Sequence, residues 1–304
     1  MKKDKLKRYL VIGGAGFIGS HITDRLVKSM HQVIVLDNLS TGTKKNINPL
    51  AKFVKADIRN LKQITPYFKN IDGVFLLAAL PRVQYSIKYP AKTNRNNIEG
   101  VLNVLIASQK ACVKRVVYSS SSSIYGNPKK LPVKENSKPN PLSPYGLQKY
   151  AGEEYCKLFF LIHNLETVSL RYFNAYGIRA SQKGAYALVM MIFINQLKKN
   201  QPLTIKGDGN QTRDFTHVYD IARANILAMN SNKVGHGEAI NIGAGKNYSI
   251  NKIASMFSDK IEYIPPVIEP HDTLANNSLA KKLLNWSPRI KLEEGINELK
   301  KYYK

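Results

Sequence analysis

The sequence predicts an α/β protein, with a doubly wound parallel sheet followed by a smaller C-terminal α/β lobe. Short β-branched runs alternate with helical segments through the first half of the chain, which is typical of parallel strands joined by crossover helices. A glycine-rich turn follows the first such run. After Arg171 the regular alternation ends and turns containing glycine and asparagine appear, which indicates the second lobe.

The expected elements follow in chain order. The strands are predicted at Tyr9–Ile12, Gln32–Leu36, Lys52–Val54, Gly73–Leu77, Arg115–Ser119 and Thr167–Arg171. Helices are predicted to begin near Phe17, Leu61, Pro90 and Pro144. The stretch 127–140 is rich in proline and lysine, and such a composition predicts a surface loop.

The 304 residues suffice for one large domain or two closely joined ones. We expect residues 1–172 to form the sheet domain and residues 173–214 and 244–304 to form the smaller lobe. Residues 215–243 are expected to return to the sheet domain, through Phe215–Met229 and Ala239–Gly243.

Composition excludes several classes of protein. Hydrophobic residues make up 43% of the chain, and no apolar run approaches a membrane span. Cys112 and Cys156 are too few for a disulfide framework, so we expect a reducing cytoplasm. The net charge of +25 comes from scattered lysines without a long basic stripe. This pattern favours a lysine-rich surface with some attraction for anionic substrates over a nucleic-acid partner.

Three glycines predict a dinucleotide site. Gly13, Gly16 and Gly19 follow the first strand directly and open a helix. Glycine lets the main chain turn tightly and approach a pyrophosphate, whose charge the helix N-terminus stabilises. The strand–turn–helix context favours this interpretation over that of a close-packed turn.

The end of the second strand indicates which dinucleotide is bound. Asp37 stands there, and no arginine or lysine follows before Lys44. A carboxylate can bond both ribose hydroxyls but repels a 2′-phosphate, so NAD is favoured over NADP. Asp57, after the third strand, is interpreted either as a contact to the adenine or as an ordinary aspartate at a strand end.

Two separate segments together predict a catalytic site. They are the serine-rich strand end at 118–126 and the helix that starts at Ser143. Tyr145 and Lys149 are one helical turn apart, so they share one face of the helix. We expect the ammonium group and the positive end of the helix dipole to lower the pKa of the phenol. The phenolate can then take a proton from a hydroxyl group that a serine holds.

The same tyrosine–lysine spacing occurs at two other places. Tyr125 and Lys129 enclose Pro128, which argues against a regular helix. Tyr248 and Lys252 are compatible with a helix, but no serine-rich strand precedes them. A serine N-cap and a proline at the first helical position favour the pair at Tyr145.

Taken together, these motifs closely resemble the extended short-chain dehydrogenase/reductase family, and within it the nucleotide-sugar 4-epimerases. The resemblance covers nearly the whole chain. It rests on the serine strand, on Tyr145 and Lys149, and on the segments 13–19, 36–42, 57–59, 77–79, 170–177, 207–215 and 284–288. It implies a Rossmann domain that binds NAD, a C-terminal lobe for the UDP-sugar and a homodimer. The absence of a long apolar run predicts that no membrane is a partner.

The resemblance also implies roles for individual residues. Ser121, Tyr145 and Lys149 would form the catalytic trio: Tyr145 removes the proton of the sugar 4-hydroxyl while hydride passes from C4 to NAD and later returns to the opposite face. Lys149 would also hold the nicotinamide ribose. No metal is implied. The cofactor contacts would be Gly13, Gly16, Phe17, Ile18, Gly19, Asp37, Asn38, Ser40, Thr41, Gly42, Asp57, Ile58, Leu77, Ala78, Ala79, Tyr145 and Lys149. The substrate contacts would be Ser121, Ser122, Asn174, Val189, Thr204, Arg213 and Thr273.

Two serines distinguish this chain from related enzymes that catalyse other reactions. Nucleotide-sugar 4,6-dehydratases resemble this chain but carry an Asp–Glu pair where Ser122 and Ser123 stand. Hydroxyl groups are not equivalent general acids or bases, and the decarboxylases of the family usually have a glutamate nearby. Both activities are therefore disfavoured. A non-catalytic protein on the same fold would not need the intact trio.

The resemblance also narrows the choice among possible UDP-sugar substrates. The stretch 176–186 is similar to epimerases that accept N-acetylated UDP-hexosamines, and Thr273 aligns with a position that gates the 2-substituent. We therefore expect interconversion of UDP-GlcNAc and UDP-GalNAc, with UDP-Glc and UDP-Gal as further substrates. The alternative is a UDP-uronic acid 4-epimerase, in which Arg179 or Lys183 would face the carboxylate.

The chain departs from the family in one segment. The arginine that the family commonly uses on the diphosphate is missing before Thr273. His271 stands near that place, either as a partial substitute or as an ordinary surface residue, and Arg213 would then bind most of the phosphate charge.

Overall fold

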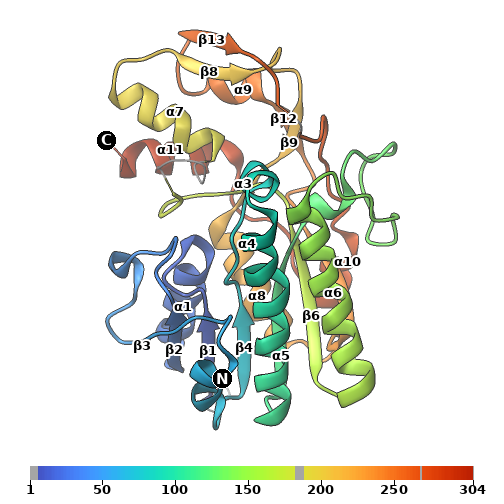
Figure 1. Cartoon of the computed structure of the whole chain (residues 1–304). Coiled ribbons are helices and arrows are strands. Elements are labelled where there is room, and N and C mark those ends of the chain that lie inside the picture. Colours follow the sequence, from blue (N-terminus) through green and yellow to red (C-terminus); the bar gives the residue numbers. More distant parts are fainter. Residues whose placement is uncertain (1–5, 182–187, 268, 304) are drawn as a thin grey trace.

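The computed structural model describes residues 6–181, 188–267 and 269–303. Its centre is a seven-stranded sheet in the order β11-β6-β5-β4-β1-β2-β3 (Figure 1), and every pair of neighbouring strands is parallel. The strands are β1 (Arg8–Ile12), β2 (Gln32–Asp37), β3 (Lys52–Lys55), β4 (Gly73–Leu76), β5 (Arg115–Ser121), β6 (Glu166–Tyr172) and β11 (His236–Ile242). The predicted doubly wound parallel fold is confirmed.

Helices cover both faces of the sheet, which explains why its central strands are apolar along their length. One face packs against α1 (Phe17–Lys28), α8 (Val218–Asn230) and α10 (Ser278–Leu284). The other face packs against α2 (Leu61–Ile64), α5 (Gly100–Lys110) and α6 (Pro144–His163). The short helices α3 (Val83–Lys88) and α4 (Pro90–Asn94) follow β4, and a π-helical turn, Arg95–Glu99, joins α4 to α5.

A smaller lobe lies over the carboxyl ends of the strands (Figure 1), around its own apolar cluster. Three two-stranded sheets belong to this end of the molecule: β8 (Leu203–Lys206) with β13 (Ile261–Ile264), β9 (Thr212–Asp214) with β12 (Asn247–Ser249), and β7 (Ala175–Tyr176) with β10 (Thr216–His217). Its helices are α7 (Val189–Lys198), α9 (Ile250–Ser255) and α11 (Leu292–Tyr302).

The segment that the sequence analysis expected to return to the sheet contains α8 and β11. Strand β11 pairs with β6 as the edge of the main sheet, and α8 packs against α1. Each predicted strand is present, with ends that differ by up to two residues. Five of the six are longer than predicted, because hydrogen bonding continues past the apolar run, whereas β4 ends one residue earlier. Helix α3 was not predicted.

Two predictions about local structure need correction. Tyr248 lies in β12 whereas Lys252 lies in α9, so this pair does not share a helix. The stretch 127–140 contains no helix or strand, yet it is not purely a surface loop. Val133 is buried there and pairs with Ala275, because its side chain fills a small apolar cluster beside Phe173.

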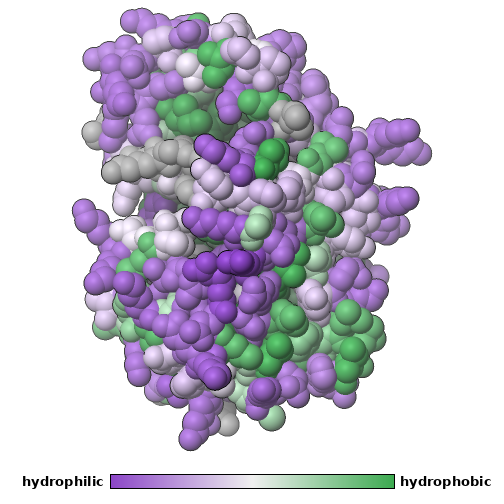
Figure 2. Space-filling model, in the orientation of Figure 1, coloured by the Kyte–Doolittle hydropathy of each residue, from purple (hydrophilic) through white to green (hydrophobic). Residues whose placement is uncertain are grey.

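Charged and polar side chains cover much of the face seen in Figure 2, with apolar groups gathered at its lower right. Within the described ranges, no helix is long and apolar enough to cross a membrane. No group of three or more histidine, cysteine, aspartate or glutamate side chains in that part of the chain could hold a metal ion.

Candidate active site

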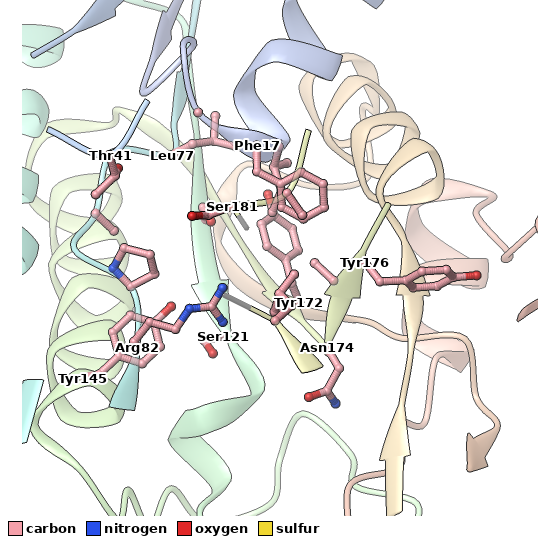
Figure 3. A pocket seen from close by; sticks show the side chains of 18 of the residues that line it. Phe17, Thr41, Leu77, Arg82, Ser121, Tyr145, Tyr172, Asn174, Tyr176 and Ser181 are labelled. Carbon is pink, nitrogen blue, oxygen red and sulfur yellow. The ribbon is translucent and has the colours of Figure 1, made fainter. Parts of the chain in front are cut away.

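A cavity of about 1320 Å³ lies at the carboxyl ends of the sheet strands and extends into the smaller lobe. In doubly wound folds this is the edge where ligands bind. All the predicted substrate contacts and catalytic residues line the cavity, as do all the predicted cofactor contacts except Gly42 and Asp57. The tertiary structure thus brings together side chains from widely separated parts of the chain (Figure 3).

The glycine turn forms a narrow cradle at one end of the cavity. Gly13 has a φ of +85°, and a Cβ atom there would lie 2.6 Å from the main-chain nitrogen of Ala78. A Cβ on Gly19 would lie 2.3 Å from the carbonyl oxygen of Gly13. Because α1 begins at Phe17, its first main-chain N–H groups and the positive end of its dipole lie beside this turn. The cradle fits a pyrophosphate.

Asp37 ends β2 at the rim of the cradle. One of its carboxylate oxygens accepts a hydrogen bond from the main chain of Ala15 at 3.1 Å, and the other accepts one from Leu39 at 2.8 Å. Burial raises the pKa of this carboxyl group. Each oxygen keeps a further lone pair, which suits two ribose hydroxyls.

The two predicted cofactor contacts outside the cavity lining support its wall. Asp57 pairs with Arg59 at 2.7 Å and accepts a hydrogen bond from Asn38 at 3.0 Å. These bonds lower its pKa to about 2. A Cβ atom on Gly42 would lie 2.9 Å from Ala15, so the chain can approach the glycine turn only because this residue is small.

The serine strand and the start of α6 form one wall. Strand β5 ends at Ser121, whose hydroxyl oxygen accepts a hydrogen bond from the main chain of Ser123 at 3.1 Å. The predicted cap of α6 is confirmed, because Ser143 accepts a hydrogen bond from Gly146 at 3.2 Å. The main-chain nitrogen of Tyr145 donates to Ser86 at 3.0 Å, which joins α6 to α3.

Lys149 is almost completely buried behind this wall. Its Nζ donates a 2.7 Å hydrogen bond to the carbonyl oxygen of Ser119 and lies 5.9 Å from the centre of the Tyr145 ring. Burial lowers the pKa of Lys149 to about 7.

The expectation of a lowered pKa for Tyr145 is wrong for the protein as described. Burial raises the pKa of this phenol and outweighs two opposing effects, a hydrogen bond with Ser121 and the charge of Arg82. Lys149 loses much of its own charge to burial, so it cannot supply the full effect that helical spacing alone predicts.

A buried ion pair holds the two parts of the wall together. Glu153, one turn beyond Lys149 on α6, lies 2.7 Å from the guanidinium of Arg171 on β6, and both side chains are buried. The hydroxyl of Ser120 donates to the same carboxylate. Arg171 also donates to the Tyr125 hydroxyl at 2.6 Å. These bonds fix the serine strand relative to α6.

The opposite wall belongs to the smaller lobe. Asn174 donates to the hydroxyl oxygen of Thr273 at 3.0 Å, and the main chain of Asp214 donates to the same oxygen at 3.1 Å. The guanidinium of Arg213 donates to the carbonyl oxygen of His271 at 2.8 Å and lies 3.2 Å from Glu269. Arg213 is therefore fixed in place at the cavity.

The other cations considered from the sequence differ in position. The side chain of His271 is 63% exposed and contacts Asp272, and it is not among the described residues that line the cavity. Its interpretation as a surface residue is favoured. Arg179 lines the cavity but pairs with Asp24 at 2.7 Å. Lys183 lies outside the described residues.

Sequence reasoning missed Arg82, Tyr302 and Tyr303, which also line the cavity. Arg82 follows the Leu77–Ala79 motif by a few residues, and that proximity is a signal in the sequence. The two tyrosines at the end of α11 carry no comparable signal, because only the return of the C-terminal helix brings them to this cavity.

Comparisons with known proteins agree with this geometry. The model of the NAD dependent epimerase/dehydratase family matches residues 9–243. A putative UDP-glucose 4-epimerase of Methanocaldococcus jannaschii is 43% identical, over 97% of this chain and 98% of that protein. A UDP-N-acetylglucosamine 4-epimerase of Methanobrevibacter ruminantium, solved with UDP-N-acetylmuramic acid, has a TM-score of 0.93 and 36% identity, covering 98% of each chain. A UDP-glucuronic acid 4-epimerase of Bacillus cereus, solved with UDP-glucuronic acid and NAD, has a TM-score of 0.90 and 34% identity, covering 97% of this chain and 98% of that one.

The parallel sheet, the glycine cradle and the tyrosine–lysine wall define a short-chain dehydrogenase/reductase. The chain belongs to the NAD dependent epimerase/dehydratase family, and it is an epimerase that uses NAD.

Proposed function

We propose that this epimerase inverts C4 of a UDP-hexosamine, interconverting UDP-GlcNAc and UDP-GalNAc, and that it also accepts UDP-Glc and UDP-Gal. The observation that carries the proposal is that Tyr145 and Ser121 line the same cavity as Asn174 and Thr273. A sugar between these walls would contact the base on one side and the gate position on the other.

The chain's own residues perform the proton transfer. NAD, when bound, supplies the reversible uptake of hydride. Tyr145 takes the proton of the 4-hydroxyl, and Ser121 holds the same oxygen by a hydrogen bond. In the return step Tyr145 gives the proton back. Arg213 and Asn174 would bind the diphosphate, because a fixed guanidinium suits two phosphate oxygens.

Thr273 supports the choice of an N-acetylated sugar. Its hydroxyl accepts hydrogen bonds from Asn174 and Asp214, so its small side chain is fixed at the cavity wall. A tyrosine in this position would fill space that an acetamido group needs. Thr273→Tyr should reduce turnover of UDP-GlcNAc more than turnover of UDP-Glc. An unchanged ratio of the two turnovers would contradict the gating role.

A UDP-uronic acid is the second candidate substrate. It is favoured by Arg82 and Arg179, whose side chains bring guanidinium groups to the cavity. Arg179 already pairs with Asp24, which reduces its attraction for a sugar carboxylate.

The deciding experiment incubates the purified enzyme separately with UDP-GlcNAc, UDP-Glc and UDP-GlcA and follows C4 epimers by NMR. We expect UDP-GalNAc to form fastest. Faster formation of UDP-GalA would favour the second candidate, and a 4-keto-6-deoxy product would replace the epimerase proposal with dehydration. Tyr145→Phe is the matched inactive control.

The functional unit is proposed to be a homodimer. Helix α6 exposes a stripe of apolar side chains, Leu147, Leu158, Leu161 and Ile162, between 45% and 68% exposed. Exposed apolar side chains gathered on one helix are typical of an association surface. Sedimentation should give a dimer that Leu161→Lys dissociates, whereas a monomeric parent protein would contradict the proposal.

The expectation of a cytoplasmic location stays a prediction. Cys112 and Cys156 are both free thiols, which suits a reducing compartment. Fractionation of the source cells with an antibody to the protein would test it.

A further inference from the structure

We propose that Arg82 is a positioning residue for the reaction: its permanent positive charge at the sugar end of the cavity stabilises the phenolate of Tyr145. The inference rests on the proposed function, because it assumes that Tyr145 is the base. It gives a role in the reaction to a residue outside the trio of Ser121, Tyr145 and Lys149. Neither the motif spacing nor the comparisons indicate that role.

Arg82 lines the same cavity as the proposed base. It lies in the loop between β4 and α3 and lines the cavity together with Tyr145 and Ser121. Figure 3 shows the Arg82 side chain beside the ring of Tyr145, with its guanidinium extending toward Ser121. The charge of Arg82 favours the ionised form of Tyr145.

The main chain at Arg82 has an unusual conformation. Its φ is +109°, a conformation that side chains other than that of glycine rarely adopt. Strain of this kind concentrates at functional sites. A glycine at position 82 would adopt this backbone conformation without strain. The arginine found there instead brings a cation to the cavity.

Several groups face Tyr145 from the neighbouring elements. Besides Arg82, these are Lys149 on α6, Tyr118 and Ser121 on β5, and Tyr172 on β6. The tyrosines carry no positive charge. Lys149 is buried, is bonded to Ser119 and has a pKa near 7, so its charge is partial at neutral pH. A guanidinium stays protonated in proteins. Arg82 therefore supplies a charge that does not vary across the working range of pH.

Two substitutions test this role. Arg82→Gly removes the charge where the backbone already suits glycine, so the variant is expected to fold. Arg82→Lys keeps a positive charge. Lys88→Ala is the matched control, because Lys88 is an exposed cation on α3 that does not belong to the described cavity lining.

The first measurement is a direct titration of Tyr145 by NMR of protein carrying ¹³C-labelled tyrosine, with Tyr145→Phe to assign the signal. We expect Arg82→Gly to raise the pKa of Tyr145 by about one unit, and Arg82→Lys and Lys88→Ala to leave it within a few tenths of the parent value. This readout needs no substrate, so it is independent of which sugar the enzyme accepts.

The second measurement is the pH dependence of kcat. Because the base must be ionised, activity falls on the acid side, and the midpoint of that fall should move to higher pH in Arg82→Gly and be restored in Arg82→Lys. UDP-sugars with and without a carboxylate on the sugar should be affected alike. An unchanged titration of Tyr145, or a loss confined to KM for a UDP-uronic acid, would overturn the proposal and make Arg82 a substrate-binding residue instead.

Discussion

The side-chain nitrogen of Lys149 lies 2.7 Å from the carbonyl oxygen of Ser119 and donates a hydrogen bond to it. This bond joins the second turn of α6 to the C-terminal part of β5. It holds the ammonium behind the serine strand, one helical turn from Tyr145, and it satisfies one of three donors in a position that water hardly reaches.

Burial of Lys149 should make stability depend on pH. Its pKa falls from 10.5 to about 7 on folding, so the unfolded chain binds more protons at this site between these values. The cost of burying the charge is therefore full below pH 7 and is lost as the pH rises toward 10.5. Lys149→Met should unfold at higher urea than the parent at pH 7, and the advantage should shrink by about 1.4 kcal/mol per pH unit above it.

The comparison for that measurement is Lys157→Met, an exposed position on the same helix. Its effect on the free energy of unfolding is measured at the same pH values and serves as the reference. Equal pH dependence in both variants would show that Lys149 does not titrate as inferred. Lys149→Met should also lose epimerase activity.

Tyr145→Phe should lower kcat by about 10²- to 10⁴-fold, because removal of the phenol removes the general base. Tyr248→Phe is the matched control, since Tyr248 shares the sequence spacing to a lysine but lies on β12, in a different element from Lys252. It should keep near-parental turnover in the NMR assay. A comparable loss of kcat in both variants would show that Tyr145 is not the general base.

Asp37→Ser should shift the choice of dinucleotide. The carboxylate at the end of β2 repels a 2′-phosphate, so its removal should raise the affinity for NADP relative to NAD on the order of tenfold, or about 1.4 kcal/mol. Calorimetric titration of both nucleotides measures the ratio. Asp72→Ser removes a carboxylate that accepts a bond from the main chain of Arg8, away from the cavity, and should leave the ratio alone. If Asp37→Ser did likewise, Asp37 would not contact the ribose.

Glu153→Gln should destabilise the protein by about 3–5 kcal/mol, because it leaves the buried guanidinium of Arg171 without its counter-charge. Glu154→Gln changes the exposed neighbour and should have little effect. Guanidinium denaturation measures both. A small effect of Glu153→Gln would mean that Tyr125 and the carbonyl of Glu135 satisfy Arg171 alone.

Much of the site was predictable because its motifs are local. The glycine turn, Asp37 and the capped start of α6 each depend on a few consecutive residues, and their backbone requirements are visible in the residue types. The electrostatics of Tyr145 were not predictable, since the spacing to Lys149 gives proximity but not burial. Arg82 was missed for a related reason: its place just after the 77–79 motif suggests a residue near the cavity but does not show which group its charge faces.

Short stretches of the chain were enough to predict the parallel sheet, the dinucleotide cradle and the pairing of a serine strand with Tyr145 and Lys149, because apolar periodicity, glycines and capping residues act locally. The folded chain was needed to show which charges surround the phenol, which side chains of the smaller lobe close the cavity, and that Val133 and Glu153 are buried. Those properties depend on the exclusion of water by segments far apart in the chain, and no local pattern records that exclusion.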